Sequence, residues 1–177
     1  MSLASISFGH EVSVTPLQMI NAISSIANGG TLMVPRITRA IIKDGRIEKR
    51  FEPKALRRVI SVQSSRQMVG ILKHVVKNGT GGGAAVKGYE VAGKTGTAQK
   101  YDPRTRSYSK TAYVSSFVGF APADAAKVAI LVMIDEPNGV NWGGSVAAPV
   151  FSNITRETLR YLNVPSSDQR VYILDRA

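Results

Sequence analysis

The sequence contains no cysteine, and this absence excludes several kinds of chemistry at once. Without thiols the chain can form no disulfide, no thiolate metal site and no cysteine nucleophile. Histidine is almost as scarce, because His10 and His74 are the only two and stand far apart. Neither lies in a nucleophile-elbow pattern with a serine, so a Ser-His-Asp hydrolase is not indicated. We therefore expect no metal centre and no cofactor.

Long apolar runs are also missing. The longest, from Val128 to Ile134, is far shorter than a membrane span, and the first three residues do not begin a secretory signal. Apolar residues make up 44% and charged residues 20% of the 177 residues, which is typical of a globular domain with a sizeable core. We interpret residues 1–7 as a linker or an added extension and residues 166–177 as a C-terminal tail.

Acidic residues are few: the sequence has 12 of them and 23 lysines and arginines, which gives a net charge of +11. Such a balance favours anionic partners, among them nucleic acid, anionic lipid and carboxylate-bearing polymers. The sequence has no run of five basic residues, and its aromatic residues do not interleave with the basic ones. We therefore expect no nucleic-acid partner.

Hydrophobic periodicity predicts helices and antiparallel strands in separate runs, which is typical of an α+β fold with helices packed on a sheet. Capping boxes are expected at Thr15–Gln18 and at Ser64–Gln67, and Asp44–Gly45 is a hairpin turn dipeptide. The continuous apolar run of the last strand is typical of a strand covered on both faces. We predict helices over 16–27, 64–77 and 148–162, a hairpin over 38–51, strands over 89–99, 113–121 and 127–134, and an exposed loop over 100–110.

The stretch from Gly88 to Thr95 matches the spacing of a phosphate-binding P-loop, G-x-x-x-x-G-K-T. A P-loop needs a strand before its first glycine and a helix that begins at its lysine and threonine. A flexible glycine-rich segment precedes Gly88, and Gly96 and Thr97 make a poor helix start. A nucleotide-binding enzyme is therefore the weaker interpretation.

In the stronger interpretation, Lys94, Thr95, Gly96 and Thr97 resemble the Lys-Thr-Gly box of penicillin-recognising enzymes, and the resemblance implies a strand at the edge of a sheet. Thr95 and Thr97 then share one face, because side chains alternate along a strand. Their two hydroxyls can bind a substrate carboxylate, to which Lys94 adds a positive charge. Free amides at the edge can pair with an extended peptide, and that of Thr97 could stabilise the oxyanion of an acyl transfer.

Five stretches in the expected order make the sequence similar to class B penicillin-binding proteins of the septal, cell-division type. They cover most of the chain between about residues 8 and 162. These stretches are VTPLQ at 14–18, ANGG at 27–30, GYEVAGKTGTAQ at 88–99, FVGFAP at 117–122 and GGSVAAPVF at 143–151. The resemblance implies that residues 1–177 form the C-terminal portion of a transpeptidase domain.

The resemblance implies D,D-transpeptidation of peptidoglycan stem peptides, which β-lactams inhibit, by an extracytoplasmic protein whose membrane anchor lies outside this chain. Lys94, Thr95, Gly96 and Thr97 would bind substrate. The family's nucleophilic serine, in Ser-x-x-Lys, and its Ser-x-Asn triplet precede this motif. The one literal match, Ser107 to Lys110, follows the motif in a polar segment. We therefore expect no catalytic residue in this chain and no activity from it alone.

Three further expectations follow from the resemblance. The missing N-terminal half of the domain should be a partner of this chain. A strand of that half pairs with residues 127–134 in the family, so the edge from Lys127 to Ile134 would be bare and could pair with a second copy. The alternative function is a module without catalysis that binds wall peptides or a division protein.

Overall fold

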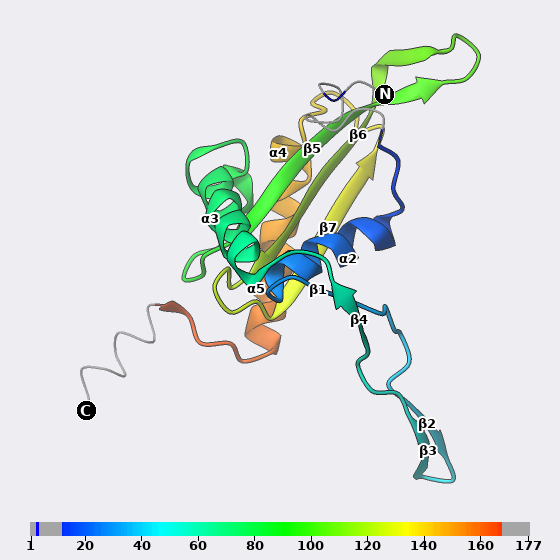
Figure 1. Cartoon of the computed structure of the whole chain (residues 1–177). Coiled ribbons are helices and arrows are strands. Elements are labelled where there is room, and N and C mark those ends of the chain that lie inside the picture. Colours follow the sequence, from blue (N-terminus) through cyan, green and yellow to red (C-terminus); the bar gives the residue numbers. More distant parts are fainter. Residues whose placement is uncertain (1–2, 4–11, 168–177) are drawn as a thin grey trace.

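The computed structural model describes residue 3 and residues 12–167 (Figure 1). The interpretation of residues 1–2, 4–7 and 168–177 as extension and tail lies outside these residues. The elements are α2 (Pro16–Ala27), β1 (Thr31–Met33), β2 (Ala40–Lys43), β3 (Arg46–Arg50), β4 (Ala55–Arg58), α3 (Val62–Asn78), η1 (Gly82–Ala84), β5 (Ala92–Asp102), β6 (Ser107–Ala121), β7 (Val128–Asp135), α4 (Gly143–Val146) and α5 (Ala148–Tyr161).

A three-stranded antiparallel sheet in the order β5-β6-β7 forms the centre of the molecule. α5 covers one face of this sheet, while α2 and α3 cover the other (Figure 1). Side chains alternate between the two layers. Phe117 is fully buried against Phe151 of α5, whereas Phe120 belongs to the cluster with Leu72 of α3. The predicted α+β fold, with helices packed on an antiparallel sheet, is confirmed.

The helix α2 has the predicted bounds and the predicted capping box. Thr15 accepts a hydrogen bond from the Gln18 amide at 3.2 Å, and the Gln18 side chain accepts one from the Thr15 amide at 2.8 Å. The cap predicted for α3 is wrong, because Ser61 and not Ser64 caps this helix, its hydroxyl accepting from the Ser64 amide at 3.0 Å. Both candidate caps are serines, so residue type alone does not distinguish them.

The exposed loop predicted over residues 100–110 is wrong, because β5 and β6 continue through it as a projecting hairpin. Lys100 anchors this hairpin through Asp135 at 3.1 Å and Glu136 at 2.6 Å. The hydrogen bond that Lys100 donates to Glu136, and then the one to Asp135, raise the pKa of Lys100 above its ordinary value. Most of the hairpin beyond Lys100 is exposed, so its strands lack the apolar alternation that identifies a half-buried strand.

The buried stripe of α5 is narrower than its apolar residues suggest. Its apolar residues Val150, Ile154 and Leu162 recur at helical spacing, which predicts an inward face for them, yet they are 40%, 44% and 47% exposed. The buried positions are instead Ala148, Phe151, Thr155 and Leu159. A helix on one face of a sheet buries a single stripe of side chains. The exposed apolar residues of α5 therefore need another explanation than packing within this chain.

The last strand, β7, is an edge strand and is mostly half-buried, so the cover on both faces that its apolar run predicts is incomplete. The predicted hairpin of β2 and β3 is confirmed, with Asp44 and Gly45 at φ 50° and 74° in its turn. None of the helices in residues 12–167 combines the length and apolarity that a bilayer crossing requires.

Candidate functional site on the edge strand β5

The residues Lys94, Thr95, Gly96 and Thr97 lie together in β5, as the sequence predicts. Within the part of the chain that the structure describes, β5 pairs with β6 alone, so its outer side is an open sheet edge. Lys94 is exposed, and the three residues after it are half-buried. The motif is therefore accessible along a strand whose far side is fixed by a long antiparallel ladder.

The phase of this ladder decides which backbone amides reach the open edge. The Glu136 amide donates to the Tyr113 carbonyl at 2.9 Å, and hydrogen-bonded pairs alternate along antiparallel strands. Ser115 and every second residue of β6 therefore face β7, and the residues between them bond β5. In the register of β5 and β6 this leaves the amides of Thr95 and Thr97 on the open side.

The hydroxyls of Thr95 and Thr97 share one face of the sheet, opposite Phe117 and Ser115 of β6. Thr97 Oγ1 accepts a hydrogen bond from the Gly143 amide at 3.0 Å. Because the hydroxyl acts as acceptor there, its own hydrogen remains available for a ligand carboxylate. The oxygens of Thr95 and Thr80 lie 2.8 Å apart, which ties the motif to the segment after α3.

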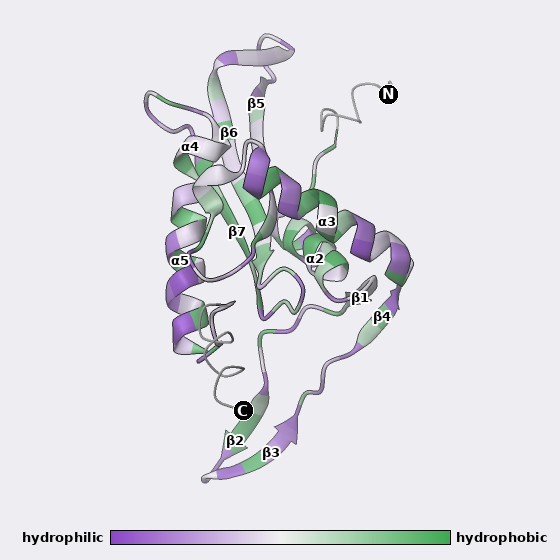
Figure 2. Ribbon diagram, turned by 90° about the vertical axis from the view of Figure 1, so that its left-hand side faces the viewer, coloured by the Kyte–Doolittle hydropathy of each residue, from purple (hydrophilic) through white to green (hydrophobic). Residues whose placement is uncertain are grey.

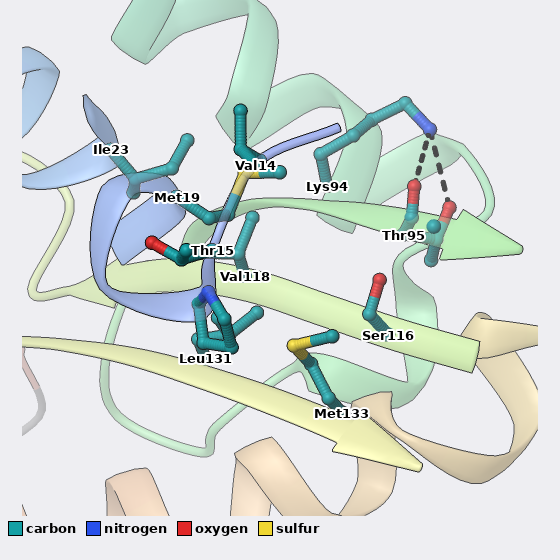
Figure 3. A pocket seen from close by; sticks show the side chains of 12 residues that line it. Val14, Thr15, Met19, Ile23, Lys94, Thr95, Ser116, Val118, Leu131 and Met133 are labelled. Carbon is teal, nitrogen blue, oxygen red and sulfur yellow. Dashed lines mark hydrogen bonds between the residues drawn. The ribbon is translucent and has the colours of Figure 1, made fainter. Parts of the chain in front are cut away.

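The Lys94 ammonium lies against the neighbouring threonine. Its Nζ donates to the Thr95 carbonyl at 3.0 Å and to Thr95 Oγ1 at 3.3 Å (Figure 3). Within residues 12–167, no carboxylate lies within ion-pair distance of Lys94. The open edge of β5 therefore presents an uncompensated positive charge beside two hydroxyls, which suits a carboxylate ligand.

An apolar groove of about 260 Å³ lies next to the motif, between β5–β7 and the start of α2 (Figure 3). Ser116 projects into it from β6, opposite Gly96, and is a polar group that sequence reasoning missed. A serine in an alternating strand gives no signal of its own. The groove is lined by Val14, Thr15, Pro16, Met19 and Ile23 on one side and by Lys94, Thr95, Gly96, Ser116, Val118, Leu131 and Met133 on the other.

Two glycines allow the backbone segments of the site to come close together. A side chain on Gly96 would overlap the Ser116 hydroxyl. A side chain on Gly143 would overlap the carbonyl oxygens of Gly96 and Ser116. The close approach at Gly143 brings its amide within hydrogen-bond distance of the Thr97 hydroxyl. These glycines are therefore required by packing, whereas neither has a positive φ.

Other sequence candidates have different surroundings. Lys94 and Thr95 lie inside an 11-residue strand, so the helix that a P-loop needs is missing there. Ser107 and Lys110 lie on β6, where residues three apart point to opposite faces. Tyr101 and Tyr108 pack edge to face, 5.8 Å apart, across the projecting hairpin.

Comparison with known proteins gives one consistent result. A family model described as the penicillin binding protein transpeptidase domain matches residues 1–156. The chain is 43% identical over 164 residues to stage V sporulation protein D of Bacillus subtilis, covering 91% of this chain and 25% of that protein.

Two solved structures are similar along most of the chain. One is the apo transpeptidase domain of Burkholderia pseudomallei penicillin-binding protein 3, with a TM-score of 0.76 and 39% identity over 92% of this chain and 47% of that one. The other is penicillin-binding protein 3 of Mycobacterium tuberculosis complexed with aztreonam, with a TM-score of 0.80 and 36% identity. That match covers 91% of this chain and 38% of the solved chain. The chain thus spans about a quarter of the first curated relative and less than half of either solved chain.

The contact between Gly96 and Ser116 yields a prediction. Gly96→Ala should lower the free energy of unfolding by about 1–3 kcal/mol, because the added methyl group overlaps the serine hydroxyl. Adding Ser116→Ala should remove most of this loss, since the obstacle is a side-chain atom. Urea denaturation of both variants measures the effect.

Gly70→Ala is the matched control for this prediction. Gly70 lies in α3 with open space around its Cα, so a methyl group there should stabilise the protein slightly. An equal loss for Gly96→Ala with and without Ser116→Ala would contradict the packing described for the motif strand.

Proposed function

Because the chain belongs to the penicillin-binding protein transpeptidase family, we propose that it is the substrate- and β-lactam-binding part of a peptidoglycan D,D-transpeptidase. The whole protein would cross-link stem peptides in cell-wall synthesis and cell division. The observation that carries this proposal is the Lys-Thr-Gly-Thr sequence on an open edge strand, with threonine amides facing outward. Beside them lies an ammonium that has no carboxylate partner within residues 12–167.

A stem peptide that ends in D-Ala-D-Ala would bind along β5 in an extended conformation. The outward amides and carbonyls of Thr95 and Thr97 suit such strand addition. The two threonine hydroxyls and Lys94 would hold the terminal carboxylate, and the Thr97 amide would donate to the oxyanion that forms during acyl transfer. A β-lactam carries a carboxylate and an acyl carbonyl in a similar arrangement and would use the same groups.

A nucleophilic serine would come from outside this chain. Acyl transfer through a covalent intermediate needs a hydroxyl with a general base beside it. Serine and lysine in a Ser-x-x-Lys pattern on a helix are not found in residues 12–167. The missing half of the domain would supply them, so we propose that this chain is inactive alone. It would work outside the cytoplasm, in a parent protein anchored to the membrane.

A module without catalysis, which holds wall peptides or a division protein, is the second candidate. The observation that favours it is the same lack of a helical Ser-x-x-Lys pattern in residues 12–167. The two functions differ in one property, because only a transpeptidase forms a covalent bond with a β-lactam.

Labelling with a fluorescent penicillin tests the proposal. The chain alone should remain unlabelled. A hybrid in which it replaces the matching segment of the Burkholderia transpeptidase domain should be labelled. Thr95→Val and Thr97→Val should each slow acylation of the hybrid roughly tenfold or more, because each removes a hydrogen bond to a charged group.

Thr105→Val, in the exposed turn of the β5–β6 hairpin, is the control and should leave the acylation rate unchanged. Covalent labelling of the chain alone would place a nucleophile within it and contradict the proposal. If both threonine variants fold and are acylated at the rate of the parent hybrid, the motif does not take part in binding the β-lactam.

We also propose that the open edge of β7 pairs with a second copy of this chain. In residues 12–167, β7 pairs with β6 alone, and the ladder phase turns the amides of Ala129, Leu131 and Met133 outward. Its apolar stretch has no charged residue or proline to discourage pairing. An antiparallel two-fold pairing centred on Leu131 would place Lys127 opposite Asp135 of the second copy, and this charge match favours that register.

Light scattering tests this pairing. The average mass of the chain should rise towards that of a dimer as its concentration increases. Leu131→Lys should keep the chain monomeric, because a buried lysine at the centre of the pairing would lose its hydration.

Ile154→Lys, on the exposed side of α5, is the matched control and should still dimerise. Dimerisation that survives Leu131→Lys, or no dimer at any concentration, would contradict pairing through β7.

A further inference from the structure

A second feature of the molecule lies far from β5. Residues 36–58, here called the basic arm, contain the β2–β3 hairpin, which projects away from the central sheet and its helices (Figures 1 and 2). Every residue of β3 is exposed. The proposed substrate site makes no use of this hairpin, so its shape and composition need their own explanation.

The basic arm holds a large part of the positive charge of the chain. Its sequence contains nine lysines and arginines against three acidic residues, so six of the eleven net positive charges lie in these 23 residues. None of the ion pairs found in residues 12–167 involves an arm residue. Among the described residues, the cations of the arm therefore have no acidic partner, and they attract anions from solution.

Lysine and arginine side chains lie close together on one side of the hairpin, although their charges repel one another. Lys43 and Arg46 stand directly opposite each other in the ladder, and like charges at such positions are unfavourable. Ile41, opposite Lys49, lies on the same side as Lys43 because side chains alternate. The Lys49 ammonium lies 5.0 Å from the centre of the Phe51 ring. An anion bound on this side would relieve the repulsion.

A hollow at the base of the hairpin adds an independent observation. Arg36, Arg39 and Arg50 line a cavity of about 360 Å³ together with Phe51, Glu52 and Pro53. The guanidinium of Arg36 is fixed there, because it donates a hydrogen bond to the Phe51 carbonyl. Guanidinium groups bind phosphate in bidentate geometry, so three of them around one hollow suit a phosphate group.

The arm also exposes apolar side chains that a soluble anion would not use. Ile37 is fully exposed, and Ile42 and Ile47, which face each other across the hairpin, are 67% and 51% exposed. Apolar residues beside lysine and arginine are typical of segments that lie in the interface of a membrane. Figure 2 shows this mixture of hydrophobic and hydrophilic residues along β2 and β3.

From these observations we propose that the basic arm binds the surface of a bilayer that contains anionic phospholipids. The hairpin would enter the headgroup region with its turn foremost, so that Lys43, Arg46 and Lys49 on one side and Ile42 and Ile47 on the other both meet the bilayer. The cations would contact headgroup phosphates, the two isoleucines would reach the boundary between headgroups and acyl chains, and the arginine-lined hollow would take one lipid phosphate. This surface is separate from the motif on β5, so it stands whether or not the chain proves to bind stem peptides.

Flotation with vesicles tests the proposal. The chain should float with vesicles of phosphatidylcholine and phosphatidylglycerol but not with phosphatidylcholine alone, and binding should weaken as salt is raised. The triple variant Lys43→Gln, Arg46→Gln, Lys49→Gln should bind roughly a hundredfold more weakly, because each cation near an anionic surface contributes about fivefold.

The projecting β5–β6 hairpin offers a matched control. The triple variant Arg104→Gln, Arg106→Gln, Lys110→Gln removes the same charge from exposed positions and should bind almost as well as the parent chain. Equal losses in both triple variants would mean that net charge alone drives binding, and this result would overturn the role of the arm.

The double variant Ile42→Ser, Ile47→Ser separates a bilayer from a soluble polyanion. It should reduce vesicle binding at least several-fold, while binding to inorganic polyphosphate should be unchanged. Unchanged vesicle binding in this variant would indicate that the arm recognises phosphate charge alone and would overturn the lipid proposal. Flotation equal on neutral and anionic vesicles would overturn it as well.

Discussion

The candidate site depends on one close contact between backbone segments. At Gly143 the chain leaving β7 comes so near to β5 and β6 that a side chain would overlap two carbonyl oxygens. This approach lets the Gly143 amide reach Thr97 Oγ1 at 3.0 Å. The next residue, Gly144, fits closely against Thr80 and Thr95. The Thr97 hydroxyl is thus held by a glycine about fifty residues further along the chain, and a second glycine there packs against Thr95.

The central sheet has two open edges with different properties. The β5 edge is polar, with Lys94 and two threonines, and lies beside a groove, which suits an extended peptide with a terminal carboxylate. The β7 edge is apolar and lacks charges between its ends. Strand pairing is the common physical principle, but on β5 it would give recognition of a ligand, and on β7 it would complete a sheet.

Much of the fold is readable from local sequence signals. Thr15 with Gln18, and Asp44 with Gly45, act within a few residues, so their cap and turn could be predicted. The poor helix start at Gly96 and Thr97 argued against a P-loop, whereas the position of Lys94 to Thr97 on an edge strand came from the family resemblance. The cap and the turn depend on nearest neighbours in the chain, and tertiary packing does not overturn them.

Other features depend on contacts that are distant in sequence and leave no local pattern. The β5–β6 hairpin is stabilised by ion pairs of Lys100 with Asp135 and Glu136, which lie about 35 residues away in the sequence. Its own strands are polar, so their sequence resembles that of a loop. The buried side of α5 is chosen by the sheet beneath it, and Ile154 therefore turns outward. Ser116 gains its place in the groove only because Gly96 lies opposite. The grouping of arginines in the basic arm likewise appears only when the chain folds back at Asp44.

In the proposed function, β5 carries the substrate-binding strand of a site that is completed by residues preceding this chain in a transpeptidase. The most direct measurement is the sequence of the coding DNA upstream of the codon for Phe8. We expect an open reading frame that continues upstream and encodes Ser-x-x-Lys within a helical pattern, followed by Ser-x-Asn. An upstream reading frame without these two motifs would contradict it and leave a binding module without catalysis.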